Sequence, residues 1–200
     1  MKKADIIKEK LIDVTTNLIM ESAGDIDGIT TRMIAKEAGV GVGLVNYHFQ
    51  TKDNLIEICV QRIIRKVISS FQPGCAAEDV PTRLKHTAKL VMDFLMENQP
   101  VSRISILGDC KSPKPNDNTM GTVRGFSHST GGKGTPQGRE LITLFALTSA
   151  MSSMFLRKDI SKDIFGIDMY NKKERGLFVE NLVDILLRGF MNEVYKEGES

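Results

Sequence analysis

Residues 30–49 have the pattern of two short helices joined by a glycine-containing turn, and this pattern constrains the fold more than any other part of the chain. Thr30 can cap the first helix, because its hydroxyl can accept a hydrogen bond from an otherwise unpaired amide of the first turn. The apolar residues of that helix recur at spacings of three and four and so share one face: Ile34, Ala35 and Ala38. Gly39 follows at the position where helices commonly end in a residue of positive φ. The segment therefore predicts a supporting helix, a tight turn and a second helix.

The second helix is expected to begin at Val42 and to place Val42, Val45 and Phe49 on one side. Its other residues face elsewhere, and a short helix with a polar outer face, held by a neighbouring helix, fits the major groove of DNA. An interior glycine such as Gly43 costs about 1 kcal/mol relative to alanine. The pattern predicts a helix-turn-helix motif, and we expect its second helix to be partly frayed until it binds DNA.

The run from Gly28 to Leu55 resembles the DNA-binding end of the TetR (tetracycline repressor) family of regulators. The resemblance rests on Thr-Thr-Arg at 30–32, Ile-Ala-Lys-Glu-Ala-Gly-Val at 34–40, Tyr-His-Phe at 47–49 and Thr-Lys-Asp-Asn-Leu at 51–55. It implies an all-α homodimer whose N-terminal three-helix, helix-turn-helix domain binds a double-stranded DNA operator. It also implies a larger C-terminal helical domain that pairs the subunits and usually holds a small-molecule inducer.

The same resemblance implies which side chains meet DNA. The planar guanidinium of Arg32 would donate hydrogen bonds to guanine, and the side-chain amide of Asn46 would pair with adenine. Lys52 would bind a phosphate at the start of the next helix, where free amides also favour an anion. The implied DNA-binding residues are Thr31, Arg32, Val42, Gly43, Leu44, Asn46, Tyr47, His48 and Lys52.

Two positions depart from the family pattern. Gly41 stands where many relatives have a serine or threonine cap, and Asn46 stands where an aromatic residue is frequent. Base reading at these two places is therefore left open. Taken singly, His48 is more often a surface histidine, and Tyr47 can simply pack its ring.

The remainder of the chain also has helical periodicity, and no strand alternation of any length appears. Gln72-Pro73-Gly74 is expected to end the linking helix. This gives a DNA-binding domain at 1–52, a linking helix at 53–72 and a helical ligand-binding and dimerisation domain at 73–200. The glycine-rich and proline-rich segment 108–138 predicts a long loop with one helix near 118–126. The other predicted helices span about 4–22, 52–71, 80–98, 100–107, 138–158 and 173–197.

Methionine and aromatic side chains in the C-terminal body are candidates for an apolar inducer pocket, because thioethers and rings suit an adaptable cavity. Residue by residue they are more often core, so the inducer depends on the resemblance. The candidate ligand residues are Met92, Met96, Met120, Phe126 and Phe145.

The last helix has an apolar face wider than one packing partner needs, and the uncharged run 141–156 has small and hydroxyl residues that allow close helix approach. At sixteen residues this run is too short to span the roughly 30 Å of a bilayer core. We expect both helices to contribute to a dimer interface. The candidate residues are Phe145, Ser149, Ser152, Val179, Val183, Leu186, Leu187 and Phe190.

Composition narrows the function further. The net charge of +2 gives no strongly basic block, so DNA affinity must come from a local patch doubled by dimerisation. Cys59, Cys75 and Cys110 form no C-x-x-C pair, which argues against a disulfide framework and a zinc site. His86 and His128 have no ligand spacing around them. We therefore expect no metal, no cofactor, no membrane partner and a cytoplasmic location.

Two alternatives stay open. One is a constitutive or architectural DNA-binding dimer that senses no ligand. The other is a nucleotide-using enzyme, suggested by the glycines at 39–43 and by Gly-Gly-Lys-Gly-Thr at 131–135. Neither glycine group follows a strand or has the spacing of a phosphate-binding loop, and no paired acid, base and nucleophile is apparent. The sequence therefore favours a ligand-responsive repressor over an enzyme.

Overall fold

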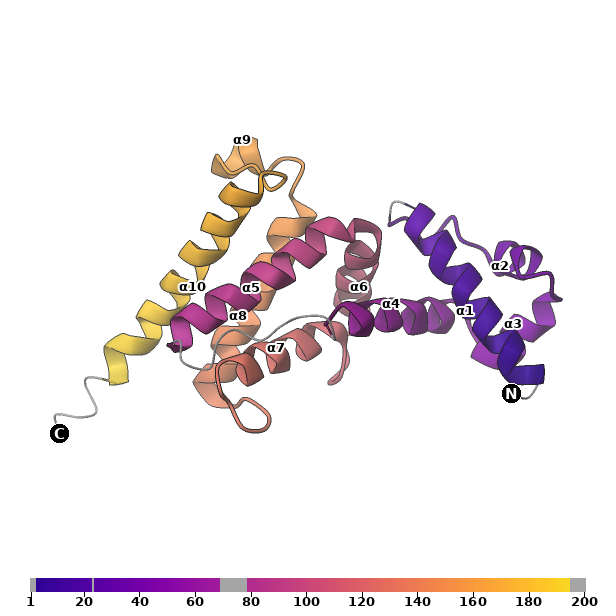
Figure 1. The fold of residues 1–200 in the computed structure, drawn as a ribbon, viewed down its shortest axis with the longest axis horizontal. Helices are drawn as coiled ribbons and strands as arrows, with labels where there is room; N and C mark the ends of the chain where they lie inside the picture. The colour runs from indigo at the N-terminus through magenta and orange to yellow at the C-terminus, as the bar shows by residue number, and fades with distance from the viewer. Residues whose placement is uncertain (1–2, 23, 69–78, 195–200) are drawn as a thin grey trace. The chain divides into compact units, whose positions relative to one another are not determined.

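A computed structural model describes residues 3–22, 24–68 and 79–194 of the chain, and these residues form ten helices and no strand (Figure 1). The predicted all-α fold is confirmed. The helices divide into two compact units, one formed by residues 1–70 and 98–111 and the other by residues 71–97 and 112–200. The predicted end of the linking helix at 72–74 lies outside the described residues.

The N-terminal unit contains five helices: α1 (Lys3–Glu21), α2 (Thr31–Glu37), α3 (Val42–Phe49), α4 (Lys52–Ile68) and α6 (Gln99–Lys111). Helix α1 packs against α2, α4 and α6, while α3 packs between α2 and α4. Their apolar faces close one core whose members include Leu11, Ile12, Ile19, Ile34, Val45, Phe49, Leu55 and Cys59. This core fixes α3 against its neighbours.

Helix α6 belongs to the N-terminal unit, although the predicted helix 100–107 was assigned to the C-terminal domain at 73–200. Val101 is fully buried and Ile104 nearly so, and both join the core formed by α1 and α4. The spacing of apolar residues in the sequence predicts the buried face of α6, but it does not show against which unit this face packs.

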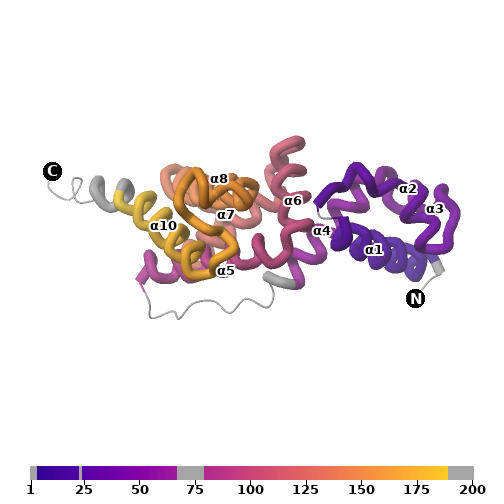
Figure 2. The backbone as a smooth tube through the Cα atoms, turned by 90° about the horizontal axis from the view of Figure 1, so that it is seen from above, coloured from indigo at the N-terminus to yellow at the C-terminus, as the bar shows by residue number. Residues whose placement is uncertain are grey.

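The C-terminal unit contains α5 (Val80–Glu97), α7 (Asn118–Ser129), α8 (Gly138–Leu156), α9 (Ser161–Phe165) and α10 (Lys172–Val194) (Figure 2). Helix α5 packs against α10, α7 and α8, and α8 also packs against α7 and α10. The largest buried side chains of this unit are Met92, Phe126, Leu147, Met151, Phe155 and Met169. A run of ion pairs joins α5 to α10: Lys85 to Asp184, Lys89 to Glu180, and Arg175 and Lys172 to Asp93.

The helix predicted near 118–126 is confirmed as α7, which extends to Ser129. The predicted loop is shorter than expected, because α6 continues to Lys111 and does not end near residue 107. Asp117 caps α7, its carboxylate accepting from the amide of Met120 at 2.9 Å. The short helix α9 was not predicted. Its five residues are too few for an apolar period to appear in the sequence.

Candidate nucleic-acid interface

Helix α2 begins and ends as the sequence predicts. The hydroxyl of Thr30 accepts from the amide of Met33 at 3.1 Å, which confirms Thr30 as the N-cap. At the other end Gly39 has φ of +64°, its amide donates to Lys36 O at 3.0 Å, and the amide of Val40 donates to Ala35 O at 2.9 Å. These two bonds form a Schellman motif, which positive φ at Gly39 makes possible. The turn that aims α3 is therefore fixed by backbone hydrogen bonds.

Helix α3 presents one face to the core and another to solvent. Val45 and Phe49 are buried, as predicted, but Val42 is exposed and does not join them. Gly43, Asn46 and the 78 % exposed Tyr47 are exposed together with Val42. Val42 and Asn46 are four positions apart, and so are Gly43 and Tyr47, so the two pairs form adjacent rows on the outer face. Leu44 and His48 are half-buried beside them, and the Tyr47 and His48 rings meet edge to face at 5.1 Å.

The start of α3 has no side-chain cap, because its N-cap is Gly41, which has no side chain. The amide of Leu44 donates to Gly41 O at 3.0 Å, which leaves the amides of Val42 and Gly43 to meet an external acceptor such as a DNA phosphate. The fraying of α3 in free protein stays a prediction.

The junction between α3 and α4 holds a feature that the sequence did not reveal. Gln50 has φ of +65° and ψ of −53°, and the amide of Thr51 donates to Phe49 O at 2.7 Å across it. This is a classic-type γ-turn, a rare and strained geometry for a non-glycine residue. Asn54 holds it from the next helix, because its side-chain amide also donates to Phe49 O, at 2.9 Å.

Two of the predicted DNA-binding cations differ in their surroundings. Arg32 is exposed on the first turn of α2, next to the half-buried Thr31. The Lys52 ammonium donates to the backbone oxygen of Ile26 at 3.1 Å and so ties α4 to the loop before α2. An ammonium has three donors, so this bond still leaves Lys52 able to contact a phosphate.

Comparisons with known proteins agree with this geometry. The family model of bacterial regulatory proteins of the tetR family matches residues 11–59, which contain α2, α3 and the start of α4. Residues 11–59 therefore carry a DNA-binding domain of the TetR family.

Its relatives include the HTH-type transcriptional regulator BetI of Burkholderia thailandensis, 28% identical over 101 residues, which are 50% of this chain and 51% of BetI. The HTH-type transcriptional regulator PksA of Bacillus subtilis is 25% identical over 99 residues, 50% of this chain and 44% of PksA. The matched region thus spans about half the length of these curated relatives.

Solved structures share the fold. A TetR transcriptional regulator from Rhodococcus sp. RHA1 superposes with a TM-score of 0.66 at 15% identity, over 93% of this chain and 98% of its own. A tetR-family transcriptional regulator from Streptomyces coelicolor gives a TM-score of 0.60 at 19% identity, over 94% of this chain and 81% of its own. At these identities the likeness concerns the fold alone.

The matched family model and the matched relatives are described as transcriptional regulators, and none of them is described as an enzyme. Both glycine groups that suggested nucleotide binding end helices instead. Gly39 closes α2, and a side chain at Gly132 would lie 2.4 Å from Ser127 Oγ, so the turn after α7 needs a glycine there. Arg83 secures that turn by donating to Ser129 O and Thr130 O.

The residues predicted to bind an inducer differ in their burial. Met92, Met96 and Phe126 are buried in the C-terminal unit, Met120 is half-buried, and Phe145 is 48 % exposed. An exposed Phe145 does not line an enclosed pocket of the same chain. Burial of the other three is what a packed core requires.

Some of the predicted dimer-interface residues are exposed and others are buried in their own chain. Phe145 and Ser149 are exposed on α8 and Ser152 is half-buried there, whereas Val179 and Val183 are fully buried in the chain's own core. The two valines therefore offer no surface to a partner, because α10 turns them toward the interior of its own unit. Leu186 and Leu187 are half-buried, and the side chain of Phe190 lies outside the described residues.

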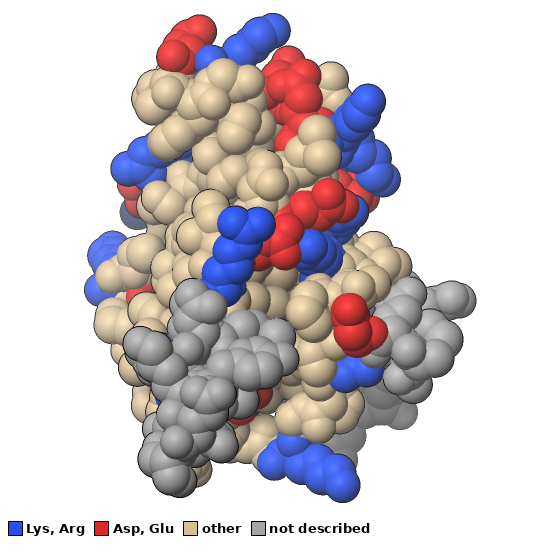
Figure 3. All heavy atoms as spheres, turned by 90° about the vertical axis from the view of Figure 1, so that its left-hand side faces the viewer, with Lys and Arg blue, Asp and Glu red and all other residues tan. Residues whose placement is uncertain are grey.

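Three exposed apolar side chains near the predicted interface were missed: Ile142 on α8 and Leu177 and Ile185 on α10. Ile142, Phe145 and Ser149 are spaced by three and four and therefore share one face of α8. That spacing was visible in the sequence. Figure 3 looks at the side of Figure 1 on which α9 and α10 lie, and there lysine and arginine are interspersed with aspartate and glutamate on a largely uncharged surface.

The cysteines within the described residues are both free thiols. Cys59 is buried on α4 and its thiol donates to Ile12 O at 3.5 Å. Burial raises the pKa of Cys59 to about 11, so the thiol is neutral at physiological pH and packs as a small apolar side chain. Among the described helices, none combines the length and the apolar character needed to cross a bilayer.

Proposed function

We propose that this chain is a DNA-binding transcriptional repressor that acts as a cytoplasmic homodimer and leaves its operator when a small, largely apolar inducer binds. The outer face of α3 carries the proposal. Val42, Gly43, Asn46 and Tyr47 stand exposed there on a helix aimed by the Schellman turn at Gly39. Such a helix can enter the major groove, while Arg32 and Lys52 lie at the starts of the flanking helices.

Dimerisation is supported by the apolar side chains that the C-terminal unit leaves exposed. Ile142, Phe145 and Ile185 are 69 %, 48 % and 67 % exposed in the single chain. Clustered exposed apolar surface is typical of a protein interface. A symmetric dimer would present two copies of α3 to half-sites about one helical turn of DNA apart.

Induction would act through the spacing of the two α3 helices. An inducer that binds more tightly to a dimer with the wrong spacing lowers operator affinity by that difference in binding free energy. One observation favours the alternative of a constitutive DNA-binding dimer without an inducer. Met92 and Phe126, two of the residues proposed to bind an inducer, are fully buried and fill the core.

The DNA interface is tested by replacing its two cations. Duplexes selected from a random pool by the purified protein serve as the specific probe, and a shuffled duplex serves as the non-specific one. Arg32→Ala is expected to lower affinity for the selected duplex by about 1–3 kcal/mol and to reduce discrimination. Lys52→Ala is expected to weaken both duplexes alike and to flatten the salt dependence.

Lys111→Ala is the matched control, because Lys111 is an exposed cation at the end of α6 and has no proposed DNA role. Fluorescence anisotropy at several salt concentrations measures all three variants. If Arg32→Ala and Lys111→Ala had the same affinities as the parent protein, α2 and α3 would not form the DNA interface. If Lys52→Ala changed thermal stability but not salt dependence, its bond to Ile26 O would be its main role.

A further inference from the structure

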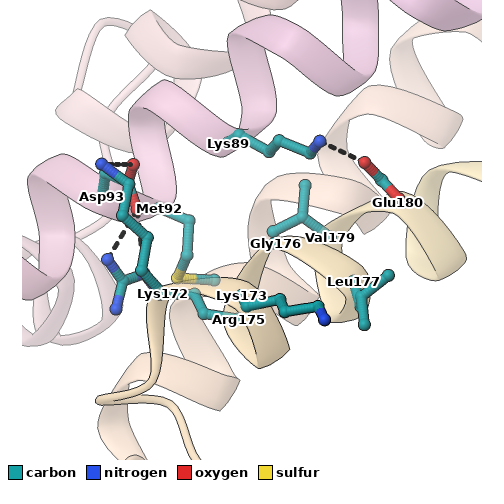
Figure 4. Close-up of a pocket in the computed structure, with 10 residues that line it drawn as sticks. All are labelled: Lys89, Met92, Asp93, Lys172, Lys173, Arg175, Gly176, Leu177, Val179 and Glu180. Atoms are coloured by element: carbon teal, nitrogen blue, oxygen red, sulfur yellow. Dashed lines mark hydrogen bonds and ion pairs between the residues drawn. The ribbon is translucent and has the colours of Figure 1, made fainter.

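The hollow of about 310 Å³ between α5 and α10 is bordered by ion pairs and by core side chains (Figure 4). Lys89 pairs with Glu180, and Asp93 pairs with Arg175. Met92, which also lines the hollow, is fully buried in the core of the unit. These contacts hold α5 against α10.

A contact of a different kind lies in the N-terminal unit, where Arg103 of α6 packs on Gly24 of the loop between α1 and α2. A Cβ atom on Gly24 would lie 2.8 Å from Cδ, 3.1 Å from Cβ and 3.4 Å from Cγ of Arg103. A separation below 3.0 Å is closer than Cβ atoms come in folded proteins, so the aliphatic stem of Arg103 takes the place of the missing side chain. Arg103 as a whole is exposed, so its guanidinium reaches water while the stem covers the buried glycine.

Gly24 and Gly39 are the glycines of positive φ among the described residues of the N-terminal unit, with φ of +88° and +64°. A Cβ atom on Gly39 would have Lys10 Nζ as its nearest neighbour, at 3.8 Å, which is ordinary van der Waals contact. Positive φ alone therefore explains the glycine at position 39. At position 24 the glycine is needed twice, because it allows the turn and lets the Arg103 stem approach the backbone.

Helix α6, which presents Arg103, is itself firmly packed in the N-terminal unit. Val101 is fully buried and Ile104 is 7 % exposed, and both belong to the core that α1 and α4 line. These two side chains fix the helix on both sides of residue 103. The stem of Arg103 therefore meets Gly24 from a well-anchored support.

The loop that Arg103 covers leads into α2, and α4 holds this loop as well. The Lys52 ammonium donates to Ile26 O at 3.1 Å. Helix α2 begins at Thr31, and Arg32 stands on its first turn. A binding residue must be held within about 0.5 Å of its productive place, so the anchoring of the loop affects where Arg32 meets a base.

From these contacts we infer that Arg103 is a positioning residue for DNA binding. Its aliphatic stem, rather than its charge, fixes Gly24 and with it the loop that sets the start of α2. The atoms of Arg103 that lie nearest to Gly24 are all carbons. This role rests on the proposed DNA-binding face of α2 and α3, and it adds α6 to the elements on which base reading depends.

Two substitutions of Arg103 in the full chain separate the stem from the charge. Arg103→Ala removes the stem and should weaken binding to the selected duplex by about fivefold, the lower end of what one base contact contributes, and should lower discrimination against the shuffled duplex. Arg103→Met keeps a stem of similar length without the charge and should bind like the parent protein. Lys111→Ala, at an exposed cation on the same helix, should also leave the affinity unchanged.

A double-mutant cycle tests the contact itself. Gly24→Ala places a methyl group against the stem, and its clash with Cδ disappears in the Arg103→Ala background. Gly24→Ala should therefore reduce affinity at least about twofold less in that background than in the parent protein. Gly39→Ala is the matched control, because Gly39 also has positive φ but has no atom of Arg103 near it, so its effect should be the same in both backgrounds.

Equal losses for Arg103→Ala and Arg103→Met, with a flatter salt dependence, would make Arg103 a phosphate contact and overturn the positioning role. Unchanged affinity of Arg103→Ala, or additive effects of Gly24→Ala and Arg103→Ala, would overturn it as well. If circular dichroism shows that Gly24→Ala is unfolded, the comparison of Arg103→Ala with Arg103→Met decides.

The proposed function and the positioning role fail in different ways. A parent protein that binds no duplex would refute the proposed DNA binding, whereas a parent protein that binds and an Arg103→Ala variant that binds equally well would refute the positioning role alone. Hydrogen exchange without DNA tests the contact separately. The amides of the loop between α1 and α2 should exchange faster in Arg103→Ala than in Arg103→Met, and equal rates would show that the stem does not hold the loop.

Discussion

The two units of the chain are held together in different ways. The N-terminal unit closes on a continuous apolar core, and its ion pair between Glu9 of α1 and Arg62 of α4 lies at the surface with both side chains nearly half exposed. The C-terminal unit also has an apolar core, but its α5–α10 contact includes Arg175, whose side chain is 7 % exposed, bound to Asp93. The guanidinium additionally donates to Met169 O at 2.9 Å.

The C-terminal unit therefore depends on a specific polar contact more than the N-terminal unit does. An exposed ion pair contributes little to stability, because water screens it and two long side chains lose freedom. A buried pair is costly to break, because the partner that stays behind keeps its charge without compensation. The units also differ at their surfaces. The N-terminal unit exposes the outer face of α3, which has polar and apolar residues, whereas the C-terminal unit exposes apolar side chains on α8 and α10.

The largest expected effect is that of Arg175→Ala. Loss of the guanidinium leaves Asp93, whose side chain is only 20 % exposed, with Lys172 as its remaining cation, and should lower the free energy of unfolding by about 3 kcal/mol. Hydrogen exchange should show faster exchange in α5 and α10. Arg62→Ala is the matched control and should barely move the unfolding midpoint. Equal effects of the two substitutions would remove the contrast between the units.

A charge on the exposed face of α8 should separate the proposed dimer. Phe145→Asp places a carboxylate in the interface and should raise the dimer dissociation constant by at least about tenfold. Analytical ultracentrifugation measures it. Phe165→Asp is the control, because Phe165 is similarly exposed but lies on α9. If Phe165→Asp dissociated the dimer and Phe145→Asp did not, the interface would lie on α9.

Relief of the strained turn should stabilise the N-terminal unit by a smaller amount. Gln50→Gly allows φ of +65° without a side-chain clash and is expected to add about 1 kcal/mol to the free energy of unfolding. Gln50→Ala keeps the clash and should give no gain. Urea unfolding followed by circular dichroism distinguishes the two. A loss of stability in the glycine variant would show that the turn is not strained.

At neutral pH the smallest effect is that of Cys59, which appears only as a pH dependence above pH 9. Because burial raises the pKa of Cys59 from 9.0 to about 11, the folded state favours the neutral thiol. Its contribution to stability is complete below pH 9 and is lost as the pH rises from 9 to about 11. Unfolding free energies across this range should fall more steeply for the parent protein than for Cys59→Ala. Parallel curves would contradict the raised pKa.

Local signals in the sequence determined the DNA-binding motif. The cap at Thr30 and the turn at Gly39 each depend on residues within five positions, so they can be read from the chain order alone. The burial of Val45 and Phe49 follows from their spacing. Composition and periodicity likewise predicted most of the helices.

Only the tertiary structure decided which helices pair and what each one covers. The Arg175–Asp93 contact joins residues 82 positions apart. Helix α6 belongs to the same unit as α1 and α4, although α5 separates it from them in the sequence. Val179 and Val183 look like any apolar stripe until their partner helix is known. Helix formation depends on neighbours along the chain, whereas helix packing depends on distant side chains that the local pattern does not contain.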